Sequence, residues 1–110
     1  MRRYSISGGD DGAYGPSFGP VSANEIGHID GPEGSRALLL RLAVPIERAA
    51  GDIEYLVVRP RYTGQTLADV QEEGCVVGIW CVPADVAESM DDGVSLEDCE
   101  YWAIGNCRPS

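Results

Sequence analysis

The chain of 110 residues has no lysine and a single histidine, His28. Without lysine, it has no residue that can form a Schiff base, hold pyridoxal phosphate or complete a Walker phosphate loop. A single histidine also excludes metal sites built on two imidazoles, including the HExxH helix. His28 stands in an irregular, glycine-flanked stretch beside Glu25 and Asp30, with no nucleophile motif near it. We therefore interpret it as a hydrogen-bonded loop residue rather than as a catalytic base.

Long apolar runs are also missing. The residues after Met1 do not form the apolar core of a signal peptide. No uncharged apolar run approaches the roughly 20 residues that are needed to cross a bilayer. We therefore expect a cytoplasmic protein without a membrane partner. In that reducing compartment, cysteines are free thiols by default.

The four cysteines are spaced too widely for the usual zinc knuckle, C-x2-4-C. They occur as C-x5-C and C-x7-C, at Cys75, Cys81, Cys99 and Cys107. On one extended strand, Cys75 and Cys81 would lie roughly 20 Å apart, too far to share an ion. We expect neither a metal nor a cofactor, and we interpret the cysteines as small buried hydrophobic residues.

One antiparallel register accounts for both the cysteines and the two tryptophans. If strands 75–82 and 99–107 pair so that residue numbers sum to 182, Cys75 faces Cys107 and Trp80 faces Trp102. The thiols then share one face of the sheet, and the tryptophans share the other. Opposed aromatic side chains stabilise a sheet. A disulfide between Cys75 and Cys107 is the alternative under oxidising conditions.

Alternating and β-branched segments, bounded by glycine and proline, predict strands over residues 3–7, 36–44, 53–59, 75–82 and 99–107. A short helix is expected over 67–73, with Thr66 as its cap and Asp69 as the capping-box partner. Helical turns are expected at 45–50 and 83–90. The predicted fold class is α+β: a single small domain over 1–110, with a four- to five-stranded, mainly antiparallel sheet, one or two short helices and a long Gly-rich N-terminal loop.

Residues 8–34 are expected to be largely loop, with one helical turn at 23–27, because glycine and proline recur through them. The stretch GGDDGAYGPSFGP displays two aromatic residues, Tyr14 and Phe18. These rings either fold back onto the core or provide an apolar anchor for a binding partner.

Charge is divided between the two halves of the chain. Residues 1–61 carry seven arginines and eight acids, whereas residues 62–110 carry ten acids and one arginine, Arg108. The net charge is −10, beyond the magnitude of about 2–8 that suits a small domain. The ten acids are Asp69, Glu72, Glu73, Asp85, Glu88, Asp91, Asp92, Glu97, Asp98 and Glu100. Such a surface repels nucleic acid and attracts basic proteins.

We therefore expect these carboxylates to bind and inhibit a basic, nucleic-acid-handling protein such as a nuclease, with Tyr14 and Phe18 as anchors. In size, charge and lack of a catalytic motif, the chain resembles phage anti-restriction and anti-CRISPR inhibitors and the immunity proteins of nuclease toxins. It carries no residue motif of these groups. Direct binding of nucleic acid is disfavoured.

Two alternatives stay open. The molecule would be dipolar, because four arginines lie on two neighbouring predicted strands, at Arg36, Arg41, Arg59 and Arg61. A dipolar domain can form a homodimer. The chain can instead be an accessory interaction domain without an inhibitory role, which packs on a larger assembly through Trp80, Trp102 or the Tyr14/Phe18 loop. The remoter alternative is a small enzyme that uses a pair of carboxylates. We expect no catalysis, since no set of acid, base and nucleophile can be assembled.

Overall fold

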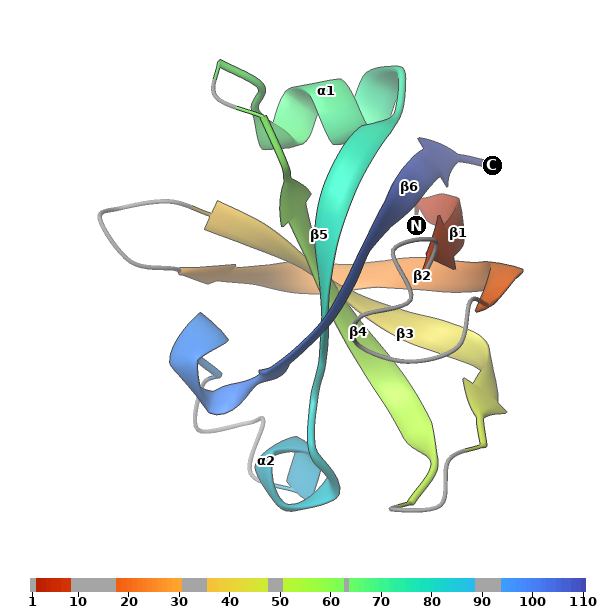
Figure 1. Ribbon diagram of the computed structural model, residues 1–110, viewed down its shortest axis with the longest axis vertical. Helices are drawn as coiled ribbons and strands as arrows, with labels where there is room; N and C mark the ends of the chain where they lie inside the picture. Colours follow the sequence, from red (N-terminus) through yellow and green to blue (C-terminus); the bar gives the residue numbers. More distant parts are fainter. Residues whose placement is uncertain (1, 9–17, 31–35, 48–50, 63, 89–93) are drawn as a thin grey trace.

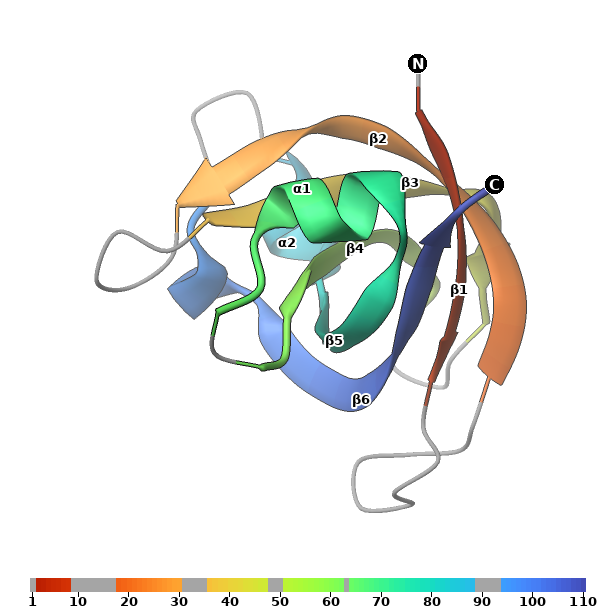
Figure 2. The ribbon, with the colours of Figure 1, turned by 90° about the horizontal axis from the view of Figure 1, so that it is seen from above.

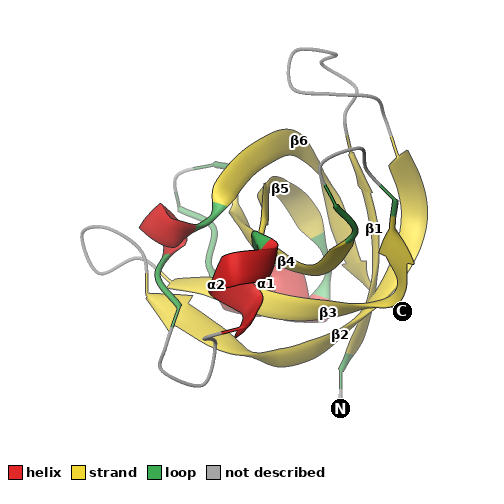
Figure 3. Cartoon of the chain, turned by 90° about the horizontal axis from the view of Figure 1, so that it is seen from below, coloured by secondary structure: helices red, strands yellow, loops and turns green. Residues whose placement is uncertain are grey.

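Six antiparallel strands form the framework of the protein (Figure 1), and strand is its dominant secondary structure (Figure 3). The structure, a computed structural model, describes residues 2–8, 18–30, 36–47, 51–62, 64–88 and 94–110. The strands are β1 (Arg3–Gly8), β2 (Phe18–Asp30), β3 (Arg36–Ile46), β4 (Ile53–Pro60), β5 (Cys75–Cys81) and β6 (Glu100–Pro109). Between them lie the helices α1 (Leu67–Glu72) and α2 (Ala84–Glu88) and the 3-10 turn η3 (Leu96–Asp98).

Pairing between β1 and β6 closes the sheet into a barrel. A small single domain of mainly antiparallel strands with two short helices is confirmed, but the expected open sheet of four or five strands is wrong. The strand that sequence reasoning missed is β2, which lies inside the expected loop over 8–34. Its breaking residues stand where a strand tolerates them: Pro20 near the start and Gly27 beside a bulge. The helical turn expected at 23–27 is also wrong, because these residues lie within β2.

The interior of the barrel is filled by apolar side chains that alternate along the strands. β3 contributes Leu38, Leu40 and Leu42, and β4 contributes Leu56 and Val58. The other strands add Tyr4, Ile6, Ala23, Val77, Ile79, Cys81, Trp102, Ala103 and Cys107. α1 lies across one end of the barrel (Figure 2), where its Val70 is fully buried against this cluster.

A second apolar cluster lies outside the barrel, under residues 82–88 and 94–99, which we call the cover. The outward side chains Leu39 and Val57 pack there with Val82 and Leu96 of the cover. Residues 36–44 and 53–59 are therefore apolar on both faces, because one face fills the barrel and the other lies under the cover.

Most predicted elements are confirmed to within a few residues, including the helix over 67–73 and, within the described residues 83–88, the turn expected at 83–90. The Asp69 carboxylate accepts a hydrogen bond from the Thr66 backbone N–H at 2.8 Å, as the capping box requires. The expected end of a strand at Pro45 is wrong, since β3 continues to Ile46. Pairing with β4 is interrupted between Arg41 and Ile46, so the missing N–H of Pro45 breaks no ladder. Residues 45–47 are not helical, and 48–50 lie outside the described residues.

A bulge in the β5–β6 pair separates the two tryptophans. The predicted register holds as far as Ile79, but the bulge then pairs Trp80 with Tyr101. Trp102 therefore points into the barrel and Trp80 stays outside, so the predicted pairing of the tryptophans is wrong. Trp80 instead contacts Tyr101 edge-to-face, with ring centroids 5.2 Å apart.

Candidate functional site

The cover and the first residue after it carry five of the predicted partner-binding acids. Asp85 and Glu88 are exposed on α2, about one helical turn apart. Glu97 and Asp98 are exposed on η3, and Glu100 is exposed at the start of β6. The sequence has no arginine, lysine or histidine between residues 62 and 107. These carboxylates therefore have no cation on their own segment.

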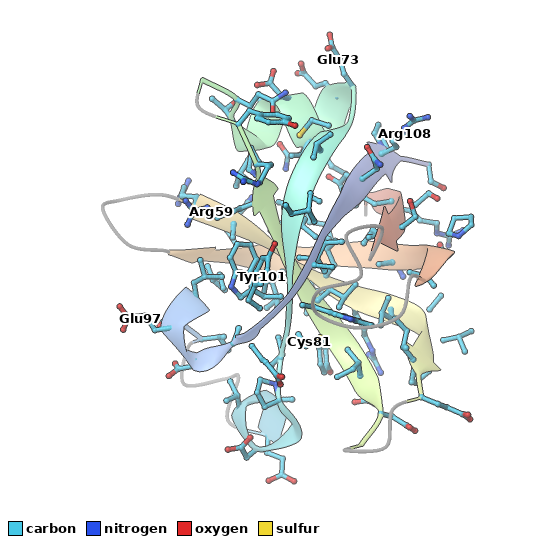
Figure 4. The ribbon with its side chains drawn as sticks, in the orientation of Figure 1. Arg59, Glu73, Cys81, Glu97, Tyr101 and Arg108 are labelled. Carbon is cyan, nitrogen blue, oxygen red and sulfur yellow. The ribbon has the colours of Figure 1, made fainter. Side chains whose placement is uncertain are left out.

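The predicted acids on α1 do not join this surface. α1 and α2 stand at opposite ends of the longest axis (Figure 1), and Figure 4 shows Glu73 beyond α1, far from Glu97. Glu72 and Glu73 are exposed at the end of α1, whereas Asp69 is partly buried and caps the helix. The structure thus divides the predicted set into two groups.

Two acids that the prediction did not include lie beside α2. Asp52 and Glu54, at the start of β4, line a hollow of about 230 Å³ together with Glu88. They belong to the charge-balanced half of the sequence, so no local signal marks them. Only the packing of the cover onto β4 brings them to α2.

Three predicted partner-binding residues, Tyr14, Asp91 and Asp92, lie outside the described residues. Phe18 begins β2, where it pairs with Gly8 of β1. The aromatic anchor expected from the 8–20 stretch therefore stays a prediction.

The arginines of β3 and β4 separate into two places. Three of them, Arg36, Arg59 and Arg61, line a cleft of about 640 Å³ beside α1. Arg41 lies elsewhere and shares a smaller hollow with Glu54. The two strands are neighbours, as expected, and Arg36, Arg41 and Arg59 lie on them. Arg61 lies beyond the end of β4, and the four side chains do not share one site.

His28 lines the same cleft. Its interpretation as a loop residue is wrong, because it belongs to a strand. It lies on β2 opposite Leu38, an interior residue of β3. Glu25, three residues earlier, lies opposite the interior residue Leu40. In a regular strand, residues three apart face opposite sides. The bulge between Glu25 and Gly27 turns both side chains toward the same end of the barrel.

A polar network ties α1 to β1 and β2. The Tyr4 hydroxyl donates to Glu25 Oε1 at 2.8 Å, and Gln71 Nε2 donates to the same oxygen at 3.0 Å. Burial alone would raise the pKa of Glu25, but these hydrogen bonds and the charge of His28 bring the pKa below its ordinary value. Burial, followed by the bond to Glu25, raises the pKa of Tyr4. The phenol therefore remains a donor throughout the neutral range.

This network predicts an acid-dependent loss of stability. Because the pKa of Glu25 is lower in the folded protein than in the unfolded chain, its contribution is present above the unfolded pKa and is lost as pH falls through the folded value. The free energy of unfolding, measured by urea titration between pH 7 and pH 3, should fall less steeply with acid in Glu25→Gln than in the wild type. Equal slopes in the two proteins would show that Glu25 is not coupled to folding.

The four cysteines are all free thiols. Cys75 lies opposite Cys107, as the register predicted. Paired residues on antiparallel strands have Cα atoms about 4.5–5.5 Å apart, within the range of a disulfide. Burial, followed by the neighbouring Cys75, raises the pKa of Cys107 to about 12. Burial, followed by the charge of Asp98, raises the pKa of Cys99 to about 11.

Slow thiol chemistry should follow from these pKa values, because the thiolate is the reactive form. At pH 7, alkylation of Cys99 and Cys107 by iodoacetamide should be roughly 100- to 1,000-fold slower in the native protein than in urea. Mass spectrometry of timed samples measures the four labels. Fast native labelling of Cys107 would contradict its burial in the barrel.

In the part of the chain that is described, none of the helices has the length and apolar character required to cross a bilayer. Within those same ranges, no three histidine, cysteine or carboxylate residues are placed to share a metal ion. Comparisons with protein-family models, with curated proteins and with solved structures find no match to this chain.

Proposed function

We propose that the protein binds and inhibits a basic, nucleic-acid-handling protein through the carboxylates around α2. The observation that carries this proposal is that Glu88 of α2 lines one hollow with Asp52 and Glu54, at the start of β4, while Asp85 lies about one helical turn from Glu88 on α2. Glu97, Asp98 and Glu100 extend the acidic surface along the rest of the cover and into β6.

A rigid base supports these carboxylates. α2 and η3 are held on the barrel by Val86, Ala87 and Leu96, which pack against the outer apolar cluster. Because the backbone that carries these carboxylates is already fixed, binding to the phosphate-binding positions of a basic groove orders only the carboxylate side chains themselves. Their field also accelerates encounter with a cationic partner.

Two matched double variants test the proposal. Asp85→Asn with Glu88→Gln removes two charges from α2, and Glu72→Gln with Glu73→Gln removes two from the end of α1. Proteins captured from a host lysate by the wild type are identified and purified, and association rate constants are measured at low and high salt. The α2 variant should associate about tenfold more slowly at low salt, and the α1 variant should match the wild type.

Two results would count against this function. Binding that is unchanged between low and high salt would remove the electrostatic basis. Equal losses in both double variants would show that only total charge matters, not the surface at α2.

The dipolar alternative has its own supporting observation, the separate arginine cleft beside α1. In that case the acids of one copy bind the arginines of another. Sedimentation would then show a dimer at low salt that dissociates as salt is added and that the α2 variant does not form.

A further inference from the structure

The cleft beside α1 is cationic in a strongly anionic protein. It has a volume of about 640 Å³ and is lined by Arg36, Arg59, Arg61 and His28. The chain has eight arginines and eighteen acids, yet none of the described residues that line the cleft is an acid. Its size lies in the range of small-molecule sites, about 300–1,000 Å³.

Two of these arginines lie where β4 ends. Arg59 is half-buried near the end of β4, and Arg61 follows it, exposed, where the chain leaves the strand toward α1. The β2 bulge turns His28 toward the same end of the barrel. Leu67 and Ala68 of α1 also line the cleft.

An aromatic hollow adjoins this cleft. The two share Arg59, Pro60 and Arg61, and the second hollow, of about 470 Å³, is completed by Trp80 and Tyr101. Arg59 pairs with Gly78 of β5. The Trp80 ring covers Gly78 so closely that a Cβ added there would stand 2.9 Å from the ring. Arg59 and Tyr101, both labelled in Figure 4, thus line the same hollow.

We propose that these two hollows bind a small phosphorylated ligand that carries an aromatic ring, of the size of a nucleotide. Guanidinium groups hold phosphate through bidentate, charge-assisted hydrogen bonds. Indole and phenol rings bind the face of a planar base by stacking. The shared arginines place the two kinds of contact next to each other, as one ligand with both groups requires.

The surrounding charge selects a small ligand over a polynucleotide. The net charge of −10 repels an extended polyanion along its whole length. α1 lines the cleft and is followed by no cation before Arg108, while its end carries the exposed acids Glu72 and Glu73, which add to this repulsion. The attraction of the arginines reaches about 8 Å before salt screens it. A single di- or triphosphate is small enough to stay within that distance.

This site is independent of the proposed function, since none of its residues belongs to the acidic surface at α2. Loss of one activity therefore leaves the other testable.

Calorimetric titration with ADP, adenosine, inorganic phosphate and a twelve-nucleotide single-stranded DNA tests the proposal on the full chain. ADP should bind saturably with a dissociation constant below about 1 mM. Adenosine and phosphate should each bind at least roughly tenfold more weakly, because each keeps only one kind of contact.

The double variant Arg59→Ala with Arg61→Ala should lose at least about tenfold in ADP affinity. Trp80→Leu should weaken ADP but not phosphate. Arg41→Ala removes an exposed arginine of the same sheet outside both hollows, so it should bind as the wild type does. Thermal unfolding verifies that each variant is folded.

Three results would overturn the proposal. The first is no saturation by ADP up to about 10 mM. The second is a loss of ADP affinity in Arg41→Ala equal to that in the Arg59→Ala, Arg61→Ala double variant. The third is tighter binding of the single-stranded DNA than of ADP. The last would assign the surface to a polynucleotide instead.

Discussion

Replacing Gly105 with alanine should open the barrel. Gly105 of β6 pairs with Gly8 of β1 at the closure. A Cβ on Gly105 would overlap the Ser7 carbonyl oxygen and stand 2.7 Å from Gly8 Cα and 2.8 Å from Ile79 Cδ1. Two of these atoms belong to the backbone of β1, so they can move only if the β1–β6 ladder separates. We expect a loss of about 3–5 kcal/mol in the free energy of unfolding, measured by urea titration.

Gly27→Ala is the matched control for this substitution. Gly27 is also in a strand, but a Cβ added there meets no atom within 4 Å. Its effect should stay within about 1 kcal/mol. Hydrogen exchange should show new exposure of β1 and β6 amides in Gly105→Ala only. A Gly105→Ala protein as stable as the Gly27 variant would mean that the two strands do not approach as described.

The second large effect concerns the two tryptophans. Trp102 is 5% exposed and lies within the barrel cluster. Trp102→Ala should therefore reduce the free energy of unfolding by about 3–5 kcal/mol, since it leaves a cavity enclosed by six strands. Chemical denaturation followed by circular dichroism measures the loss without relying on the missing fluorophore.

Trp80→Ala serves as the comparison, because Trp80 is the same residue type outside the barrel. It is half-buried against the cover and Tyr101, so its removal should cost about 1–2 kcal/mol. Equal costs, or a larger cost at Trp80, would contradict the bulge that separates the two side chains.

Local signals in the sequence predicted most individual elements but not the closure. Residues 53–59 and 75–82 are β-branched runs bounded by glycine or proline, and Thr66 with Asp69 marks the start of α1; these features act within a few residues. The pairing of β1 with β6 joins the two ends of the chain. No local pattern distinguishes such a pair from two open edges.

Bulges caused the errors of register. One extra residue reverses every later side chain on a strand. Because of this effect, Trp102 points into the barrel instead of pairing with Trp80, and His28 lies on the same face of β2 as Glu25. A register argument based on residue numbers holds only between bulges, as it did from Cys75 to Ile79.

The candidate site was predictable in its chemistry but not in its grouping. The absence of cations between residues 62 and 107 marked the acids from sequence alone. Their division between α1 and α2, and the addition of Asp52 and Glu54, depend on how the cover packs. The convergence of Arg59 and Arg61 with the Trp80–Tyr101 pair depends on strand order, which the sequence does not display.

The placement of α1 and α2 at opposite ends of the longest axis (Figure 1) has a consequence for occupancy. A protein docked on α2 leaves the cleft beside α1 uncovered, so the two occupants would not compete. If both proposals hold, the domain would bind a small ligand beside α1 and a protein on α2 at the same time.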